Sequence, residues 1–149
     1  MICIYEGDGL DRLSPLCDLR PAFDLRCGRF TLLEKFIRLY PDEQVFLWVR
    51  EELQELTAEA HPRCAVNDRV DSDCLFLSAQ AILDEVVPVN GDEALFTHGG
   101  VVVGFRLEVA TAQRLGSVRS LSLDLPESEV KAHVIEWPWD AIEYNPDEL

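Results

Sequence analysis

Short apolar runs that alternate with amphipathic segments constrain the fold of this chain most. Residues 1–5, 44–49 and 73–77 are apolar stretches of strand length. Residues 31–39 and 51–60 between them carry apolar side chains at helical spacing. Strands that alternate with helices predict a mainly parallel sheet with helices on both faces.

The second half of the chain adds further elements to this sheet. A β-hairpin is predicted around Gly99-Gly100, a dipeptide typical of tight turns. The expected order is a helix, the two hairpin strands, a second helix and a last strand or strand-like extension, at residues 79–87, 93–97, 101–106, 108–115 and 130–135. A length of 149 residues suits one domain with a buried core. We therefore expect a single three-layer α/β domain.

Charge and composition exclude several classes of protein. The chain has 13 Lys and Arg residues against 28 Asp and Glu residues, a net charge of −15, whereas nucleic-acid binding requires an extended basic face. No apolar run is long enough to span a membrane, and the N-terminus lacks the basic region of a secretory signal. The five cysteines show no C-x-x-C spacing, which indicates reduced thiols rather than disulfides or a zinc site. We expect a cytoplasmic protein without nucleic-acid or membrane partners.

A cationic island interrupts this acidic sequence. Residues 12–35 have a net charge of +2, because three acidic residues accompany five cations, namely Arg12, Arg20, Arg26, Arg29 and Lys35. Pro15 and Pro21 prevent a continuous helix, so the first part of the island is a long loop after the first strand. Ligands of parallel sheets bind beyond the carboxyl ends of the strands. Guanidinium groups match phosphate geometry, so the island predicts a polyanion site; ordinary surface ion pairs are the alternative.

Other candidate motifs are weaker. The chain has no Walker loop, no G-x-G-x-x-G fingerprint and no G-x-S-x-G elbow. The acidic pair Asp71 and Asp73 precedes its strand, which is more typical of a solvated turn than of a metal site. None of the three histidines has a second metal ligand at a spacing typical of a metal site. We therefore interpret His61, His98 and His133 as solvated or hydrogen-bonded. We single out His98, beside the predicted hairpin turn, as the one histidine to test.

Two tryptophans lie near the C-terminus. Trp137 and Trp139 flank a proline, and this pattern most often indicates a terminal helix that packs on the sheet. A stacking surface for a base or a sugar is the second interpretation.

Four motifs together resemble a known family. They are Arg20-Pro21-x-x-x-Leu25-Arg26-x-Gly28-x-x-Thr31-x-x-Glu34-Lys35, Leu75-Phe76-Leu77, Gly99-Gly100-Val101-Val102 and Trp137-Pro138-Trp139-Asp140-Ala141-Ile142-x-x-Asn145. The chain resembles the sugar nucleotidyltransferases related to the N-terminal half of the bifunctional N-acetylglucosamine-1-phosphate uridyltransferase/glucosamine-1-phosphate acetyltransferase. The resemblance spans nearly the whole chain.

The resemblance implies a nucleotide-diphospho-sugar transferase fold, which is Rossmann-like, and a specific reaction. A sugar 1-phosphate, of the N-acetylhexosamine type, attacks the α-phosphate of a nucleoside triphosphate, expected to be UTP, and pyrophosphate leaves. Mg²⁺ is the suspected cofactor. By analogy with the signature loop of the family, Arg26 and Lys35 are the catalytic candidates. The implied substrate-binding residues are Arg20, Gly28, Thr31 and Asp140.

The chain also departs from this family. The glycine-rich signature loop of standard members is missing from this chain, and only Gly28 remains of it. Their metal-binding aspartate is replaced by Ser78-Ala79-Gln80, so the metal ligands are unknown and Asp140 is a candidate substitute. The hexapeptide repeats of relatives do not occur among these 149 residues, and we expect a single domain that is truncated relative to standard members.

Three functions therefore stay open. The first is an active nucleotidyltransferase. The second is an inactive nucleotide- or sugar-binding or assembly module, normally attached to a hexapeptide-repeat acyltransferase. The third is an acidic homo-oligomer whose arginines are structural.

Overall fold

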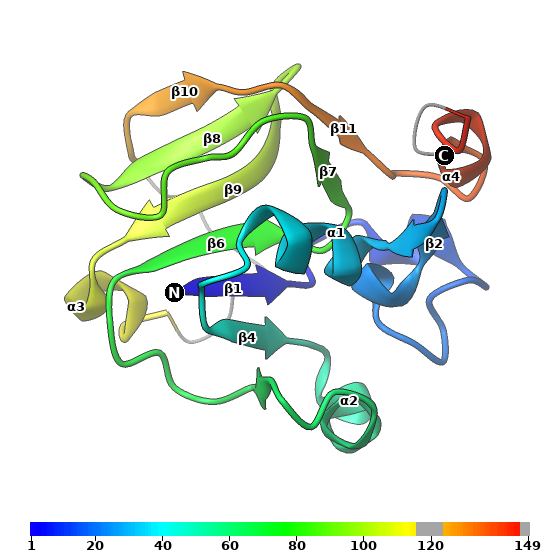
Figure 1. The fold of residues 1–149 in the computed structure, drawn as a ribbon, viewed down its shortest axis with the longest axis horizontal. Coiled ribbons are helices and arrows are strands. Elements are labelled where there is room, and N and C mark those ends of the chain that lie inside the picture. Colours follow the sequence, from blue (N-terminus) through cyan, green and yellow to red (C-terminus); the bar gives the residue numbers. More distant parts are fainter. Residues whose placement is uncertain (116–123, 147–149) are drawn as a thin grey trace.

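The computed structural model describes residues 1–115 and 124–146, which form a mainly parallel sheet with helices around it (Figure 1). The strand order is β10-β8-β9-β6-β1-β4-β5. The strands are β1 (Ile2–Tyr5), β4 (Val45–Trp48), β5 (Ala65–Val66), β6 (Cys74–Ser78), β8 (Ala94–His98), β9 (Val101–Leu107) and β10 (Glu127–Glu129). β1 is parallel to both β4 and β6, whereas β9 is antiparallel to β6 and β8. The predicted fold class is confirmed.

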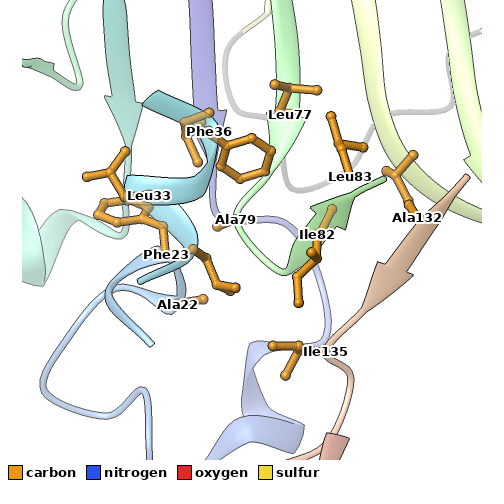
Figure 2. Close-up of a cluster of buried hydrophobic side chains, with 14 of the residues drawn as sticks. Ala22, Phe23, Leu33, Phe36, Leu77, Ala79, Ile82, Leu83, Ala132 and Ile135 are labelled. Carbon is orange, nitrogen blue, oxygen red and sulfur yellow. The ribbon is translucent and has the colours of Figure 1, made fainter. Parts of the chain in front are cut away.

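The first face of the sheet is covered by α1 (Leu32–Leu39). Thr31 and Glu34 form a reciprocal capping box that starts this helix. Its buried residues Leu33 and Phe36 share one core cluster with Leu77 of β6. Figure 2 shows Leu33 beside Phe23 of the preceding loop. The amphipathic pattern of residues 31–39 therefore corresponds to the buried face of α1.

The second face carries an aromatic core. Phe76 and Phe105 stack with ring centroids 4.8 Å apart, and Tyr5 lies 5.2 Å from Phe105. Ala112 of α3 (Val109–Ala112) packs into the same cluster. Alternate residues of β1 thus serve different cores, because successive strand side chains point to opposite faces.

The hairpin and the second helical segment are also confirmed in outline. Gly99 and Gly100 join β8 to β9 with φ angles of 56° and 81°, as a type I′ turn requires. The predicted helix at residues 51–60 consists of a short 3₁₀ helix, η3 (Glu51–Leu53), and of α2 (Gln54–Ala60).

The helix expected at residues 79–87 is wrong. This segment contains β7 (Ala81–Leu83), which pairs antiparallel with β11 (Ala132–Val134). Every side chain of β7 is buried, so the sequence shows no alternation that distinguishes a strand from a helix. The last strand predicted at residues 130–135 corresponds to β11, whereas β10 was not predicted because its three residues are all exposed.

The island folds into several short elements tied to the sheet. They are η1 (Leu10–Leu13), η2 (Ala22–Asp24), β2 (Arg26–Cys27) and β3 (Phe30–Thr31). The buried Glu6 carboxylate, directly after β1, accepts hydrogen bonds from the Ala22 N–H at 3.0 Å and from the Arg50 backbone N–H at 3.1 Å. Glu6 therefore ties the far end of the loop that follows β1, and the chain just after β4, to the carboxyl end of β1.

The C-terminal segment corrects the prediction for the tryptophans. α4 (Asp140–Glu143) lies beside β2 (Figure 1) and contacts the core through Ala141 and Tyr144. The Trp137 and Trp139 rings stack on each other 5.1 Å apart and are 42% and 58% exposed. The rings cover one another instead of the sheet, so packing of the terminal helix onto the sheet through these tryptophans is wrong.

Two further features are the state of the cysteines and the length of the helices. All five thiols are free, and four of them are buried. None of the helices in the described ranges has the length and apolar character needed to cross a membrane.

Candidate functional site

A cleft of about 320 Å³ opens beyond the carboxyl ends of β1 and β6. Tyr5 and Ser78 are the last residues of these two parallel strands and are neighbours in register. The cleft therefore lies at the edge where parallel sheets bind their ligands. Its volume is within the range of small-molecule sites.

One side of the cleft is the loop that follows β1. Gly7, Asp8, Gly9 and Arg12 line it. Gly9 has a φ of 87°, a conformation that glycine adopts without strain, and it lets the chain turn into η1. Arg12 Nη1 donates to Glu136 Oε2 at 2.7 Å across the cleft rim. The rim therefore carries one guanidinium group next to two carboxylates.

The opposite side is apolar. It consists of Leu95 from β8, of Val101, Val102 and Phe105 from β9, and of Val134 from β11. Val101 and Val102 are more than a third exposed, so their methyl groups are available for contact. This wall suits the flat face of a base or the C–H face of a sugar.

The floor consists of uncharged polar side chains. Tyr5, Ser78 and Gln80 line the cleft and are 5%, 8% and 6% exposed. Gln80 Nε2 donates to the Ile135 carbonyl oxygen at 2.8 Å, which fixes the orientation of the amide. Burial, reinforced by Cys3 and Asp8, raises the pKa of the Tyr5 hydroxyl far above its ordinary value. The floor therefore stays neutral at physiological pH.

The predicted catalytic and substrate-binding cations lie outside this lining. Arg20 Nε donates to the Leu16 carbonyl oxygen at 2.9 Å, in a separate shallow depression formed by residues 15–20. Arg26 Nη1 donates to the Arg29 carbonyl oxygen at 2.7 Å. Lys35 is half-buried on α1. Arg12 is the member of the island that reaches the cleft, and the roles of Arg20, Arg26 and Lys35 stay predictions.

The other three predicted residues make structural hydrogen bonds. The Gly28 N–H donates to Asn145 Oδ1 at 2.7 Å, which joins the β2–β3 turn to the C-terminal segment. Thr31 caps α1. Asp140 Oδ2 accepts the N–H groups of Glu136 and Trp137 at 2.9 and 2.8 Å. These bonds hold the segment that carries Glu136 in place; they do not test a role in substrate binding.

The residues considered as metal ligands also have local partners. Asp73 Oδ1 accepts the Val109 N–H at the start of α3. The three histidines each have a polar neighbour: His61 lies 2.9 Å from Asp24 Oδ1, His98 3.0 Å from the Val130 carbonyl oxygen, and His133 3.7 Å from Asp84 Oδ2. His61 and His98 are therefore hydrogen-bonded, whereas the His133 side chain is 37% exposed and lies beyond hydrogen-bond distance of Asp84.

The cleft does not fit the metal anchor of the family. In the cleft, carboxylates come from Asp8 and from Glu136, and Glu136 already pairs with Arg12. The end of β6 offers a hydroxyl and an amide, which are poor substitutes for the carboxylate that holds Mg²⁺ against substrate phosphates. Across residues 1–115 and 124–146, no group of three or more His, Cys, Asp and Glu residues could hold a metal ion. We therefore assign no step to Mg²⁺.

Several of these lining residues were not found from the sequence. Arg12 was predicted as a member of the cationic island, but Gly7 and Gly9 were not singled out. Their position gives a usable signal, because two glycines lie at the carboxyl end of a buried strand. Tyr5 and Gln80 carry no such signal, because an uncharged polar residue beside an apolar run is common.

A parallel sheet with a cleft beyond its central strands, a glycine-containing loop and an arginine at the rim defines a Rossmann-like α/β domain with a candidate small-molecule site. The family model described as sugar nucleotidyl transferase matches residues 2–149. The chain belongs to this family. No curated protein matches it closely enough to be named as a relative.

Solved structures share the fold at low sequence identity. CTP:phosphocholine cytidylyltransferase from Streptococcus pneumoniae is 14% identical with a TM-score of 0.59, and the match covers 98% of this chain and 97% of that one. A protein assigned as a glucose-1-phosphate thymidylyltransferase from Bacillus anthracis is 8% identical with a TM-score of 0.63, over 99% and 94% of the chains. HddC from Yersinia pseudotuberculosis is 7% identical with a TM-score of 0.57, over 98% of each chain. These likenesses establish the nucleotidyltransferase fold.

Proposed function

We propose that this domain binds a nucleoside triphosphate and a sugar 1-phosphate in the cleft beyond β1 and β6, and joins them into a nucleotide sugar with release of pyrophosphate. The observation that carries the proposal is the position of the cleft, at the carboxyl ends of two central parallel strands and against the Gly7–Gly9 loop. Family membership supports the same class of reaction.

The residues around the cleft suggest how the ligands are held. Glycines at positions 7 and 9 let phosphate oxygens approach backbone N–H groups closely. Arg12 supplies positive charge at the rim, where an incoming phosphate competes with Glu136 for the guanidinium group. An oxygen of the sugar phosphate attacks the α-phosphorus and the bond to pyrophosphate breaks, so positioning of the two ligands is the main task of the protein.

The identities of base and sugar rest on different support. UTP and an N-acetylhexosamine 1-phosphate come from the resemblance to the uridyltransferases. Two of the solved neighbours are named for cytidylyl and thymidylyl transfer. A nucleotide panel of UTP, CTP and dTTP therefore tests the base. Alanine variants in the same titrations test the proposed roles in substrate binding of Arg20, Gly28, Thr31 and Asp140. The proposed roles of Arg26 and Lys35 in catalysis are tested by the pyrophosphate-release assay described below.

A non-catalytic binding module is the second candidate. The specific observation in its favour is the charge of the cleft, where Asp8 and Glu136 outnumber Arg12. Two phosphorylated substrates need more positive charge than this lining supplies. In that role the domain would bind nucleotide or sugar and position an attached acyltransferase, as the resemblance implies.

Calorimetric titration with UTP, CTP and dTTP tests the site. We expect Arg12→Ala to weaken binding of the preferred nucleotide by about tenfold, the typical effect of losing one charge-assisted contact. Arg38→Ala is the matched control, because Arg38 is exposed and stacks on Phe30 outside the cleft. Equal losses in both variants, or no binding of any nucleotide to the folded wild-type protein, would refute the assignment of the cleft.

A pyrophosphate-release assay separates the two candidates. The assay contains N-acetylglucosamine 1-phosphate, the preferred nucleotide and Mg²⁺. Release that disappears in Arg12→Ala supports the transferase, whereas nucleotide binding without release supports the module. Parallel assays of Arg26→Ala and Lys35→Ala decide whether the predicted catalytic pair contributes.

A further inference from the structure

Three buried polar side chains form the floor of the cleft. Tyr5 and Ser78 stand side by side, because they are register partners at the ends of β1 and β6. Both lie on the face of the sheet that carries Phe76 and Phe105. Gln80 follows two residues after Ser78 and is tied to Ile135 of the C-terminal segment. All three are more than nine-tenths buried and line the same cleft.

These side chains keep unused hydrogen-bonding capacity. No hydrogen bond joins the Tyr5 hydroxyl to any residue in the described part of the chain. The Gln80 amide nitrogen is occupied by Ile135, which leaves Oε1 as an acceptor. Ser78 Oγ accepts the Gln80 N–H at 3.4 Å and can still donate its proton. Among the described residues, Thr57 Oγ1 is the buried side-chain polar atom that lacks a partner, so the Tyr5 hydroxyl and Gln80 Oε1 are open to the cleft, where a ligand can replace water.

The chemistry of that molecule follows from the neutral floor and its surroundings. Two hydroxyl donors and an amide acceptor match the hydroxyl groups of a sugar, each of which can donate one hydrogen bond and accept up to two. Val101 and Val102 offer an apolar surface for sugar C–H groups. A phosphate placed at the floor would have no cation there, because Arg12 stands at the rim beside Glu136.

We propose that Tyr5, Ser78 and Gln80 form a recognition floor for the uncharged glycosyl unit of the ligand, and that this recognition does not depend on a metal ion. The inference rests on the proposed function, since it places the sugar of a nucleotide sugar in the proposed nucleotide cleft. It assigns sugar selection to neutral residues at the position where standard family members carry a metal-binding carboxylate.

The test compares nucleotides with and without a sugar. Calorimetry measures the affinity of UDP against UDP-N-acetylglucosamine, and of dTDP against dTDP-glucose, each in EDTA and in Mg²⁺. The ratio within each pair isolates the contribution of the glycosyl unit. We expect the sugar to increase affinity in at least one pair and the increase to persist in EDTA.

Substitutions that remove single polar groups sharpen the test. Tyr5→Phe and Ser78→Ala each lose one hydroxyl and are expected to lower this ratio by about three- to tenfold, the effect of one neutral hydrogen bond. Affinity for the plain nucleoside diphosphate should fall less than affinity for the nucleotide sugar, so the ratio of the two affinities is the readout. Tyr144→Phe is the matched control, because Tyr144 is not part of the cleft lining and contacts His133.

The outcomes distinguish the inference from the function on which it rests. If the diphosphates bind but the ratio is unaffected by Tyr5→Phe and Ser78→Ala, the recognition floor is refuted and the nucleotide site stands. If the sugar contributes only in Mg²⁺, metal-independent recognition is refuted. If neither the diphosphates nor the nucleotide sugars bind to the folded protein, both proposals fail. Circular dichroism of each variant confirms that a lost signal does not come from unfolding.

Discussion

Removal of the Glu6 carboxylate should destabilise the fold and loosen the loop beside the cleft. The Glu6 side chain is 1% exposed and follows β1 directly. Its carboxylate accepts three hydrogen bonds: from the Ala22 N–H at 3.0 Å, from the Arg50 N–H at 3.1 Å and from Arg50 Nε at 3.2 Å. Glu6→Ala therefore leaves two backbone N–H groups and Arg50 Nε without their acceptor.

The expected loss of stability depends on the hydrogen bonds that Arg50 keeps when Glu6 is replaced. Breaking a buried ion pair typically costs about 3–5 kcal/mol. Arg50 is 16% exposed and its Nη2 still donates to the carbonyl oxygens of Cys17 and Arg20, so its charge keeps some partners. We expect a loss of about 3 kcal/mol in the free energy of unfolding, which corresponds to a fall of about 6–12 °C in Tm for a chain of this size.

Urea unfolding followed by tryptophan fluorescence measures this effect. Glu52→Ala, which removes an exposed carboxylate of η3, is the matched control and should change stability by less than about 0.5 kcal/mol. The double variant with Arg50→Ala should be less destabilised than the sum of the single variants, by about 1 kcal/mol or more. A loss below about 1 kcal/mol for Glu6→Ala, or strictly additive effects, would refute the role of this network.

Three further changes test other parts of the fold. Gly104→Ala should destabilise the protein strongly in thermal unfolding, because a Cβ at this position would lie 2.5 Å from the Phe76 carbonyl oxygen; a Tm within about 2 °C of wild type would contradict this close approach. Burial raises the pKa of Asp24 despite its His61 partner, so the folded protein holds this proton more tightly than the unfolded chain, and stability is lost as pH rises through the raised pKa. Asp24→Asn should remove this loss, which urea midpoints between about pH 3 and pH 7 would detect; an unchanged pH dependence would argue against it. Burial raises the pKa of Cys17 to about 11 and of Cys74 to about 12, so iodoacetamide at neutral pH should label the half-buried Cys64 first, and mass spectrometry showing earlier labelling of either buried thiol would contradict the fold.

The central sheet could be predicted from the sequence because its signals are local. The runs that become β1, β4 and β6 are continuous, apolar and of strand length. Gly99 and Gly100 indicate a tight turn, because glycine adopts the positive φ angles that such a turn requires. Each of these features is decided by neighbours in the chain, so no knowledge of the rest of the fold was needed.

Prediction failed where distant segments decide the structure. Residues 81–83 are as compatible with a helix as with a strand, and they are extended because β11, about fifty residues later, supplies their hydrogen bonds. Trp137 and Trp139 were expected to pack on the sheet, but their two rings stack on each other. In both cases the local pattern was ambiguous and a tertiary contact selected one outcome.

Charge was an incomplete guide to the site for a related reason. The cationic island was treated as one unit, whereas its arginines have separate partners: Glu136 for Arg12, and backbone carbonyl groups for Arg20 and Arg26. A guanidinium group has five N–H donors and bonds whichever acceptor is nearest. Clustering of cations along the sequence therefore predicts a basic segment, but does not show which cation reaches the ligand.

The floor of the cleft shows what a better reading of the sequence would need. In a parallel pair the carboxyl ends lie at one edge, so the last residues of β1 and β6 are natural candidates for a site. Alternation along each strand places Tyr5 with Cys3 and Ser78 with Phe76, on the same face. The missing information is only that β1 and β6 are neighbours and how they are registered. Once that pairing is known, the two polar residues at separate strand ends form a single candidate site. The order of the strands in the sheet therefore predicts the position of the functional site of such a domain better than charge does.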